Sequence, residues 1–300
     1  MTLWIPFTLA AATFQTARFM LQKYLSMGQL SAAGATFSRF VYSAPLILLG
    51  LVVYMQLGGH VLPALSGRFF VFATIGGLTQ ILATVCVVLL FKARNFAVGI
   101  TFKKTEVILS VLVGLIVLGE GVSLAGLVAI LVGVLGVLLL SKTPGIDGRW
   151  FEHLGSRAVA LGLASGLLFA ISAVSYRGAT LELDAGDPLL RAGVTLAVVV
   201  CWQTLVMAIW LVLRDPGELR AVWQARRVAL WVGLTSMGGS LCWFVAFALQ
   251  TPAYVKALGQ VELILSLIAS VLFFKETITA REIAGMALLV LSILGLVLVI

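Results

Sequence analysis

Apolar residues along the chain form ten runs of about 20 residues, separated by short stretches that hold Pro, Gly or charged residues. An α-helix rises 1.5 Å per residue, so a helix of about 20 residues crosses the roughly 30 Å hydrocarbon core of a bilayer. The pattern therefore predicts an all-α polytopic membrane protein with ten transmembrane helices. The predicted spans are residues 4–24, 33–56, 69–91, 96–118, 122–141, 157–180, 189–213, 227–249, 253–274 and 278–299.

The composition agrees with this pattern. Hydrophobic residues make up 61% of the 300 residues, charged residues make up 11%, and the mean hydropathy is +1.14. Soluble domains carry roughly 25% charged residues, so we expect no separate soluble domain and take the lipid bilayer as the partner. The net charge of +8 does not indicate a nucleic-acid partner, because Lys and Arg in such a chain chiefly set the orientation of the loops.

The second half of the chain repeats part of the first. A displacement of 156 residues aligns residues 77–140 with 233–296 without a gap. Each half then holds five spans, and an odd number makes the second half enter the membrane from the opposite face. We therefore expect two inverted five-helix repeats, residues 1–141 and 157–300, joined by a loop at residues 142–156. The polar residues that match are Glu106 with Glu262, Ser110 with Ser266, and Glu120 with Glu276.

Glu106 and Glu262 each lie near the middle of a predicted span, within the shared phrase Glu-X-Ile-Leu-Ser. A carboxylate at bilayer depth is costly, so it normally faces a bundle interior or a water-filled cavity. We expect both to act as proton carriers or as partners of a substrate ammonium group. The alternative is that each bonds a neighbouring helix or its own Ser four residues on. Lys256 is expected on the opposite side of its helix from Glu262.

Four cations fall at a similar predicted depth, roughly 10 Å inside the face opposite the N-terminus. They could form a basic vestibule for a carboxylate or phosphate group, since Arg offers a bidentate fork and Lys a compact charge. In the alternative interpretation, these long side chains reach back to the interface, or Lys103 pairs with Glu106. Lys103 and Lys104 point about 100° apart on a helix, so both cannot face one cavity. The four are Arg18, Arg39, Lys103 and Lys104.

Two further residues are candidate substrate contacts. Gln15 belongs to a polar stripe on the first predicted helix that leads to Arg18. Trp243, with Phe244 and Phe247, lies inside the eighth predicted span and could line a cavity, although ordinary helix packing is the simpler explanation. The two histidines and three cysteines show no metal-ligand spacing, so we expect no metal and no cofactor.

Local features predict how some helices end or bend. Pro45 lies within the second predicted span and should kink it. Glu120 and Glu276 lie at helix corners, where a carboxylate can cap the following helix.

The paired phrase gives the chain a resemblance to the drug/metabolite transporter superfamily, in its ten-helix EamA-type form. The first copy runs from Glu106 through Gly119-Glu120, and the second from Glu262 through Lys275-Glu276. In the family the Gly-Glu pair marks the corner between the fourth and fifth helices of each half. Members often carry Pro just after the mid-helix Glu. Here Val107 and Leu263 stand at those positions, so no proline break is expected there.

The orientation of the chain is left open by two conflicting indications. The predicted loops on the face opposite the N-terminus hold far more Lys and Arg than those on the N-terminal face. The positive-inside rule then places both termini outside the cytoplasm. The family resemblance implies cytoplasmic termini.

These observations predict a secondary active transporter in a cell membrane, with the bacterial inner membrane expected. We expect it to export small polar metabolites, anionic or zwitterionic, by alternating access with proton coupling or exchange. One alternative is a multidrug exporter of lipophilic cations, and another is a lipid-headgroup translocator or a non-transporting membrane subunit. No His, Cys or Asp constellation lies at bilayer depth, so the chain is not expected to be an enzyme.

Overall fold

The computed structural model describes residues 3–28, 30–91, 103–140, 157–265 and 280–299. These residues are mostly helical, and no strand occurs among them. The first half contributes α1 (Trp4–Gly28), α2 (Ala32–Val41), α3 (Ala44–Gly58), α4 (Gly67–Phe91), α6 (Glu106–Leu118) and α7 (Leu124–Leu140). The second half contributes α8 (Arg157–Leu181), α9 (Pro188–Arg214), α10 (Pro216–Gln224), α11 (Arg226–Leu249), α12 (Pro252–Gly259) and α14 (Ala280–Val299).

Five of the described helical segments are long and apolar enough to cross a membrane, and three shorter helices are also apolar. The prediction of an all-α multi-pass membrane protein is therefore confirmed, while the number of ten spans stays a prediction. The long segments are Ala32–Gly58, Gly67–Leu90, Arg157–Leu181, Pro188–Arg214 and Arg226–Leu249. The shorter ones are Glu106–Leu118, Leu124–Leu139 and Ile283–Leu298.

The bend predicted at Pro45 is present as a break in the helix. The second predicted span divides into α2, which ends at Val41, and α3, which begins at Ala44. Pro45 therefore lies in the first turn of α3, where its missing N–H would have no helical partner in any case.

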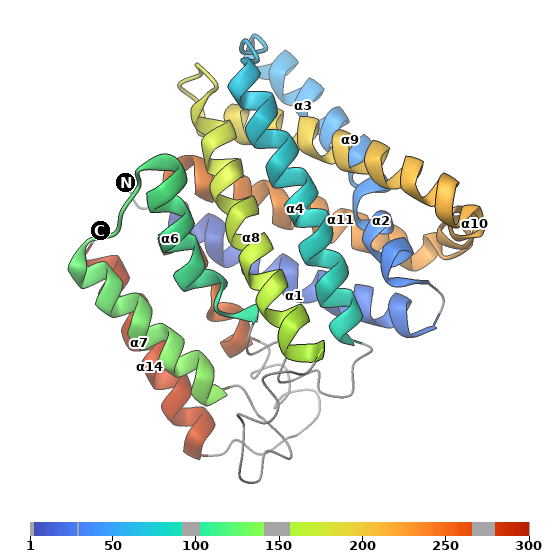
Figure 1. The fold of residues 1–300 in the computed structure, drawn as a ribbon. Coiled ribbons are helices and arrows are strands. Elements are labelled where there is room, and N and C mark those ends of the chain that lie inside the picture. The colour runs from blue at the N-terminus through green and yellow to red at the C-terminus, as the bar shows by residue number, and fades with distance from the viewer. Residues whose placement is uncertain (1–2, 29, 92–102, 141–156, 266–279, 300) are drawn as a thin grey trace.

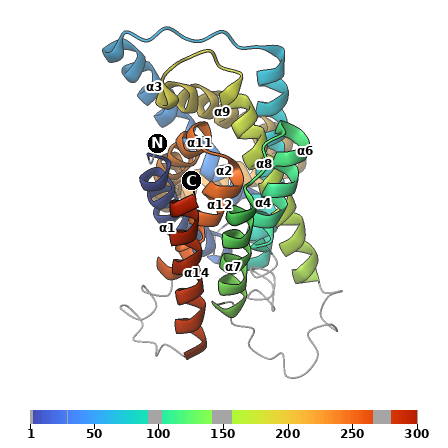
Figure 2. The same ribbon diagram turned by 90° about the vertical axis from the view of Figure 1, so that its left-hand side faces the viewer.

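The two halves of the chain pack against each other through several pairs of helices (Figures 1 and 2). The most extensive helix pairings are α4 with α8, α7 with α14, and α1 with α11. Each pair joins a helix of the first half to one of the second. The outer surface is apolar, with Leu57, Ile116 and Leu298 strongly exposed, as a lipid-facing surface requires. A set of polar and charged side chains, including Arg39, Lys104 and Glu262, is buried inside.

The corner between α6 and α7 has the geometry that the resemblance implied. Gly119 adopts a left-handed φ of 66°, which glycine reaches without steric cost, and the Glu120 amide donates to the Gly114 carbonyl. The capping role expected for Glu120 is wrong, because its carboxylate binds Arg177 of α8, 2.8 Å away. The start of α7 is capped instead by Ser123, whose hydroxyl accepts from the Gly126 amide at 3.1 Å. Glu276 lies outside the described residues.

Candidate substrate site

Two helix interruptions stand directly before the matched glutamates. A turn at Lys104 and Thr105 precedes Glu106, the first residue of α6. In the second half α12 ends at Gly259, Gln260 forms a turn, and helix resumes before Glu262. Both interruptions occur without proline, so the continuous helices predicted at residues 96–118 and 253–274 are wrong at these points. Interrupted helices at membrane depth are tolerated where they line an interior site.

Close packing surrounds both interruptions. A Cβ added to Gly166 of α8 would lie 2.9 Å from the Lys103 carbonyl oxygen, so only glycine lets α8 approach the first interruption this closely. A Cβ on Gly259 would lie 2.5 Å from the ring of Trp243. The backbone of each interruption is thus held against a neighbouring helix rather than exposed to lipid.

Glu262 is bound by two residues of the first half. Lys104 donates to Oε1 of Glu262, and the Gln15 side-chain amide donates to Oε2 at 2.6 Å. This bridge ties the first interruption to the second. These bonds agree with the alternative weighed from the sequence, in which Glu262 bonds a neighbouring helix.

Glu106 has a looser environment. Its Oε1 lies 3.8 Å from Nζ of Lys103, so the ion pair weighed as an alternative from the sequence is confirmed. Its Oε2 is buried and has no hydrogen-bond partner among the described residues. Ser110 donates to the backbone carbonyl of Glu106, at 2.6 Å, and not to its carboxylate.

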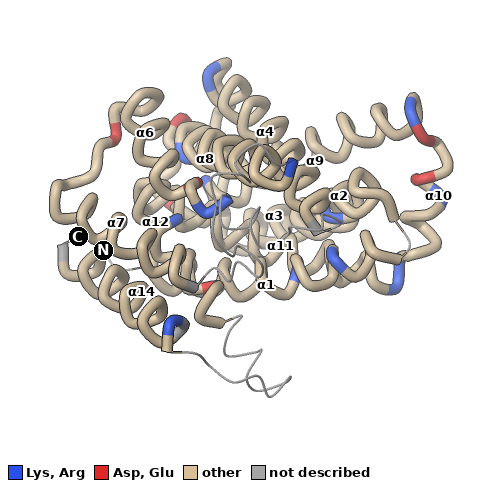
Figure 3. The backbone as a smooth tube through the Cα atoms, turned by 60° about the horizontal axis from the view of Figure 1, so that its bottom comes forward, with Lys and Arg blue, Asp and Glu red and all other residues tan. Residues whose placement is uncertain are grey.

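The two arginines are buried in the bundle, so the interpretation that they reach back to the interface is wrong. Arg39 donates to three neutral hydroxyls, those of Ser236 at 2.9 Å, Thr84 at 3.1 Å and Ser240 at 3.3 Å. Arg18 donates to Gln22 at 3.3 Å and its guanidinium lies 4.4 Å from the centre of its neighbour's ring, that of Phe19. Figure 3 shows Lys and Arg positions in the middle of the bundle as well as at its edges.

Lys256 lies inside an aromatic cage. Its ammonium is 4.7 Å from the ring centre of Trp243, 5.6 Å from that of Phe169 and 5.8 Å from that of Phe247. The negative faces of aromatic rings attract a cation, and this attraction is stronger when the cation is desolvated. Among the described residues no carboxylate forms a salt bridge with this ammonium.

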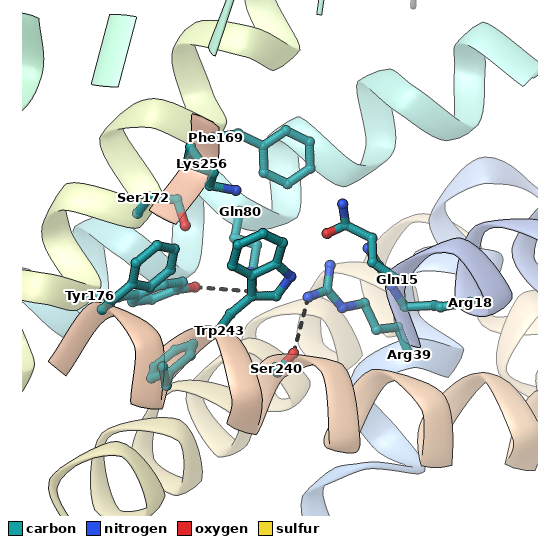
Figure 4. Close-up of a pocket in the computed structure, with 13 residues that line it drawn as sticks. Gln15, Arg18, Arg39, Gln80, Phe169, Ser172, Tyr176, Ser240, Trp243 and Lys256 are labelled. Carbon is teal, nitrogen blue, oxygen red and sulfur yellow. Dashed lines mark hydrogen bonds between the residues drawn. The ribbon is translucent and has the colours of Figure 1, made fainter. Parts of the chain in front are cut away.

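A small internal cavity lies between these groups (Figure 4). Its volume of about 20 Å³ holds about one water molecule, so the cavity is too small for a metabolite in this conformation. Helices of both halves contribute to its wall. The lining residues are Gln15, Arg18, Arg39, Gln80, Phe169, Ser172, Ala173, Tyr176, Ser240, Trp243, Phe244, Phe247 and Lys256.

The structure divides the eight predicted site residues into two groups. Gln15, Arg18, Arg39 and Trp243 line the cavity. The others form the two ion pairs beside it, Lys103 with Glu106 and Lys104 with Glu262.

Sequence reasoning missed several lining residues. Lys256 was assigned to the far side of its helix on the assumption of a continuous helix, which the turn at Gln260 invalidates. Tyr176 donates to Gln80 at 3.0 Å, and no spacing in the sequence linked the two. Polar residues inside apolar runs were the only available signal for them.

Fold and site define a multi-pass helical membrane protein with a closed, cation-rich interior. Residues 156–298 match the EamA-like transporter family, so this chain carries an EamA-like transporter domain. This domain is consistent with a member of the drug/metabolite transporter superfamily. No curated protein matches the sequence. A solved crystal structure, described only as that of a protein, is similar with a TM-score of 0.69 and 16% identity, over 97% of this chain and 99% of its own. That similarity concerns the fold alone.

Proposed function

We propose that the protein is a secondary active transporter that exports small anionic or zwitterionic metabolites across a bacterial inner membrane. The transporter family found at residues 156–298 sets the class of function. The proposed substrate site is supported by the pair of helix interruptions beside Glu106 and Glu262. Charged side chains lie around one interior cavity near these interruptions. Substrate and ion sites of secondary transporters are typically built from such discontinuous helices.

The helix pairings support alternating access by two inverted repeats of five spans. In the first half α1 and α4 are the first and third predicted spans, and α8 and α11 hold the same places in the second half. A two-fold axis that exchanges the halves would turn the α1 and α11 pair into the α8 and α4 pair, and both pairings occur. Rocking one set of helices against the other would then open the cavity to each face in turn.

The charges around the cavity favour a substrate with a negative group. Arg18, Arg39 and Lys256 line it, whereas no Asp or Glu does among the described residues. Both interior carboxylates already have an ammonium neighbour, so a lipophilic cation would find no unpaired counter-charge. The multidrug alternative is therefore less well supported than an anionic or zwitterionic cargo.

Coupling to a proton or to a counter-substrate involves Glu106 and Glu262 in this proposal. The unpartnered oxygen of Glu106 offers a position for a proton. Protonation of Glu262 would weaken its bond to Lys104 and so loosen the link between the halves. In this conformation Lys103 and Lys104 pair with the two carboxylates and do not line the cavity. Their proposed influence on the substrate is therefore indirect, through Glu106 and Glu262.

A thermal-shift screen of the purified protein tests the substrate class. Anionic, zwitterionic and cationic metabolites are compared on the unaltered protein, on Arg39→Gln and on the exposed control Arg220→Gln. A ligand that binds only the folded state raises the melting temperature. We expect anions or zwitterions to stabilise the protein and the control, and to lose this effect in Arg39→Gln. Stabilisation by lipophilic cations alone would contradict the proposal, and uptake of the best ligand into proteoliposomes tests transport itself.

A further inference from the structure

The interior of the bundle holds more positive than negative charge. Seven Lys, Arg and Glu side chains are buried among the described residues, five cations and two carboxylates. The carboxylates are Glu106 and Glu262, and each has one lysine beside it. Among the described residues the buried side chains therefore carry three more positive than negative charges.

The three remaining cations all line the same cavity. They are Arg18, Arg39 and Lys256, and they come from α1, α2 and α12. Lys256 is 8% exposed, and its ammonium contacts aromatic rings. It forms no salt bridge with a carboxylate in the described part of the chain. Figure 4 shows the ammonium of Lys256 and the guanidinium of Arg39 on either side of Trp243. Their charges converge on a common space.

One neutral donor on the same wall is also unused. The indole Nε1 of Trp243 is buried and has no hydrogen-bond partner among the described residues. Buried donors in native proteins are nearly always paired, and an indole N–H can only donate. An acceptor placed between Lys256 and Arg39 would pair it. In the part of the chain that the structure describes, the wall thus offers three positive charges, an unpaired donor and no negative charge.

From this charge balance we propose that the cavity takes a multiply charged anion, a dicarboxylate or a phosphate monoester, and that transport is obligatory one-for-one anion exchange. The inference rests on the proposed function and narrows its substrate class. Charges in a low-dielectric interior are stable only when they are paired. A monoanion leaves two of the three cations unpaired, whereas a dianion balances most of the excess.

The exchange mechanism follows from the same imbalance. An empty site would carry three unpaired cations through the conformation that is closed to both faces, which is the costly state for charged groups at membrane depth. A bound anion removes this penalty. The conformational change is therefore fast only when the site is filled, and each anion that leaves must be replaced before the site can return.

The binding step is tested by thermal shift with sulfate, phosphate and succinate against chloride, at equal ionic strength. We compare the unaltered protein with Lys256→Met, with the charge-preserving Lys256→Arg and with the exposed control Lys23→Met. We expect the three dianions to raise the melting temperature of the unaltered protein, Lys256→Arg and Lys23→Met beyond chloride. Lys256→Met should bind them roughly 10- to 100-fold more weakly, as expected for the loss of one charged contact.

Lys256→Met should also melt higher than the unaltered protein when no dianion is present, because it removes part of the charge excess. A merely structural lysine would not give these opposite changes. The proposal is overturned if no dianion stabilises the unaltered protein beyond chloride, or if Lys256→Met keeps the full response. If Lys256→Met does not fold, the comparison between Arg39→Gln and Arg220→Gln with the same dianions decides.

The exchange step is tested in proteoliposomes with labelled phosphate or succinate, whichever gives the larger shift. Vesicles are loaded with the same unlabelled dianion or with chloride. We expect initial uptake to be at least tenfold faster into the dianion-loaded vesicles. Equal uptake into both overturns obligatory exchange but leaves the proposed transporter intact. The proposed function is also overturned if neither kind of vesicle takes up the dianions or any other solute that stabilises the protein.

Discussion

Glu106 and Glu262 occupy equivalent places in the two halves but differ in their partners. Each follows a helix interruption, and each lies in the shared phrase. Glu262 is held by Lys104 and Gln15 through both of its oxygens. Glu106 has one ammonium at 3.8 Å and one oxygen with no described partner. The backbone repeats more faithfully than the charge does.

The residues just before the glutamates explain the difference. Lys103 and Lys104 precede Glu106, whereas Gly259 and Gln260 stand at the matched positions before Glu262. The second half therefore brings no cation of its own to its carboxylate, and Lys104 crosses from the first half to supply one. The asymmetry makes Glu262 a structural link between the halves and leaves one oxygen of Glu106 without a hydrogen-bond partner among the described residues.

The largest expected effect comes from breaking this link. Glu262→Gln or Lys104→Met leaves the other partner as an uncompensated buried charge, and such changes typically cost about 3–5 kcal/mol of unfolding free energy. Denaturation in detergent should show this loss for each single variant. The double variant should recover much of it, because no unpaired partner then remains. Additive losses in the double variant would show that the two side chains are not coupled.

A smaller effect is expected at the matched position. Glu106→Gln removes a long ion pair and keeps a polar group of the same size, so it should cost roughly 1 kcal/mol, with Lys103 keeping its ring contacts. The folded variant should lose the pH dependence of flux in proteoliposomes. Flux that keeps its pH dependence in this variant would remove Glu106 from the coupling step. A loss of stability equal to that of Glu262→Gln would contradict the asymmetry between the two carboxylates.

The sequence predicted the class of fold and the charged composition of the site, but not which side chains meet. Apolar runs and the paired phrase depend on local pattern, so the helices and the eight candidate residues could be read from them. The bond between Lys104 and Glu262 joins residues 158 positions apart. A local sequence pattern cannot predict a contact over that separation. The aromatic cage of Lys256 was hidden for a different reason, since a helix interruption without a proline changes the direction in which a helix residue points.

The repeat itself suggests a variant with a still smaller effect. Gln260 stands where the first half has Lys104, so Gln260→Lys should reach across to Glu106 as Lys104 reaches to Glu262. The cost of burying a new cation would then be offset by the new pair, and stability should change by no more than about 1 kcal/mol. The matched control is Gln260→Lys combined with Glu106→Gln, which leaves the new cation unpaired. If this double variant is as stable as Gln260→Lys, the new lysine does not reach Glu106.

The smallest effect is expected at a second ion pair between the halves, whose side chains are more exposed. The side chains of Arg177 and Glu120 are 13% and 20% exposed, against 4% and 12% for Lys104 and Glu262. Arg177 also donates to the carbonyls of Phe247 and Ala248, at 2.8 and 3.0 Å, so it keeps partners when the carboxylate is neutralised.

Glu120→Gln should therefore cost only about 0.5–1 kcal/mol of unfolding free energy. The cost should shrink further in high salt, because screening acts on charges that water reaches. The loss caused by Glu262→Gln should persist in the same salt. Equal losses for the two variants, or equal salt sensitivity, would mean that burial does not set the strength of the link between the halves, and that the difference between the two regions must come from geometry instead.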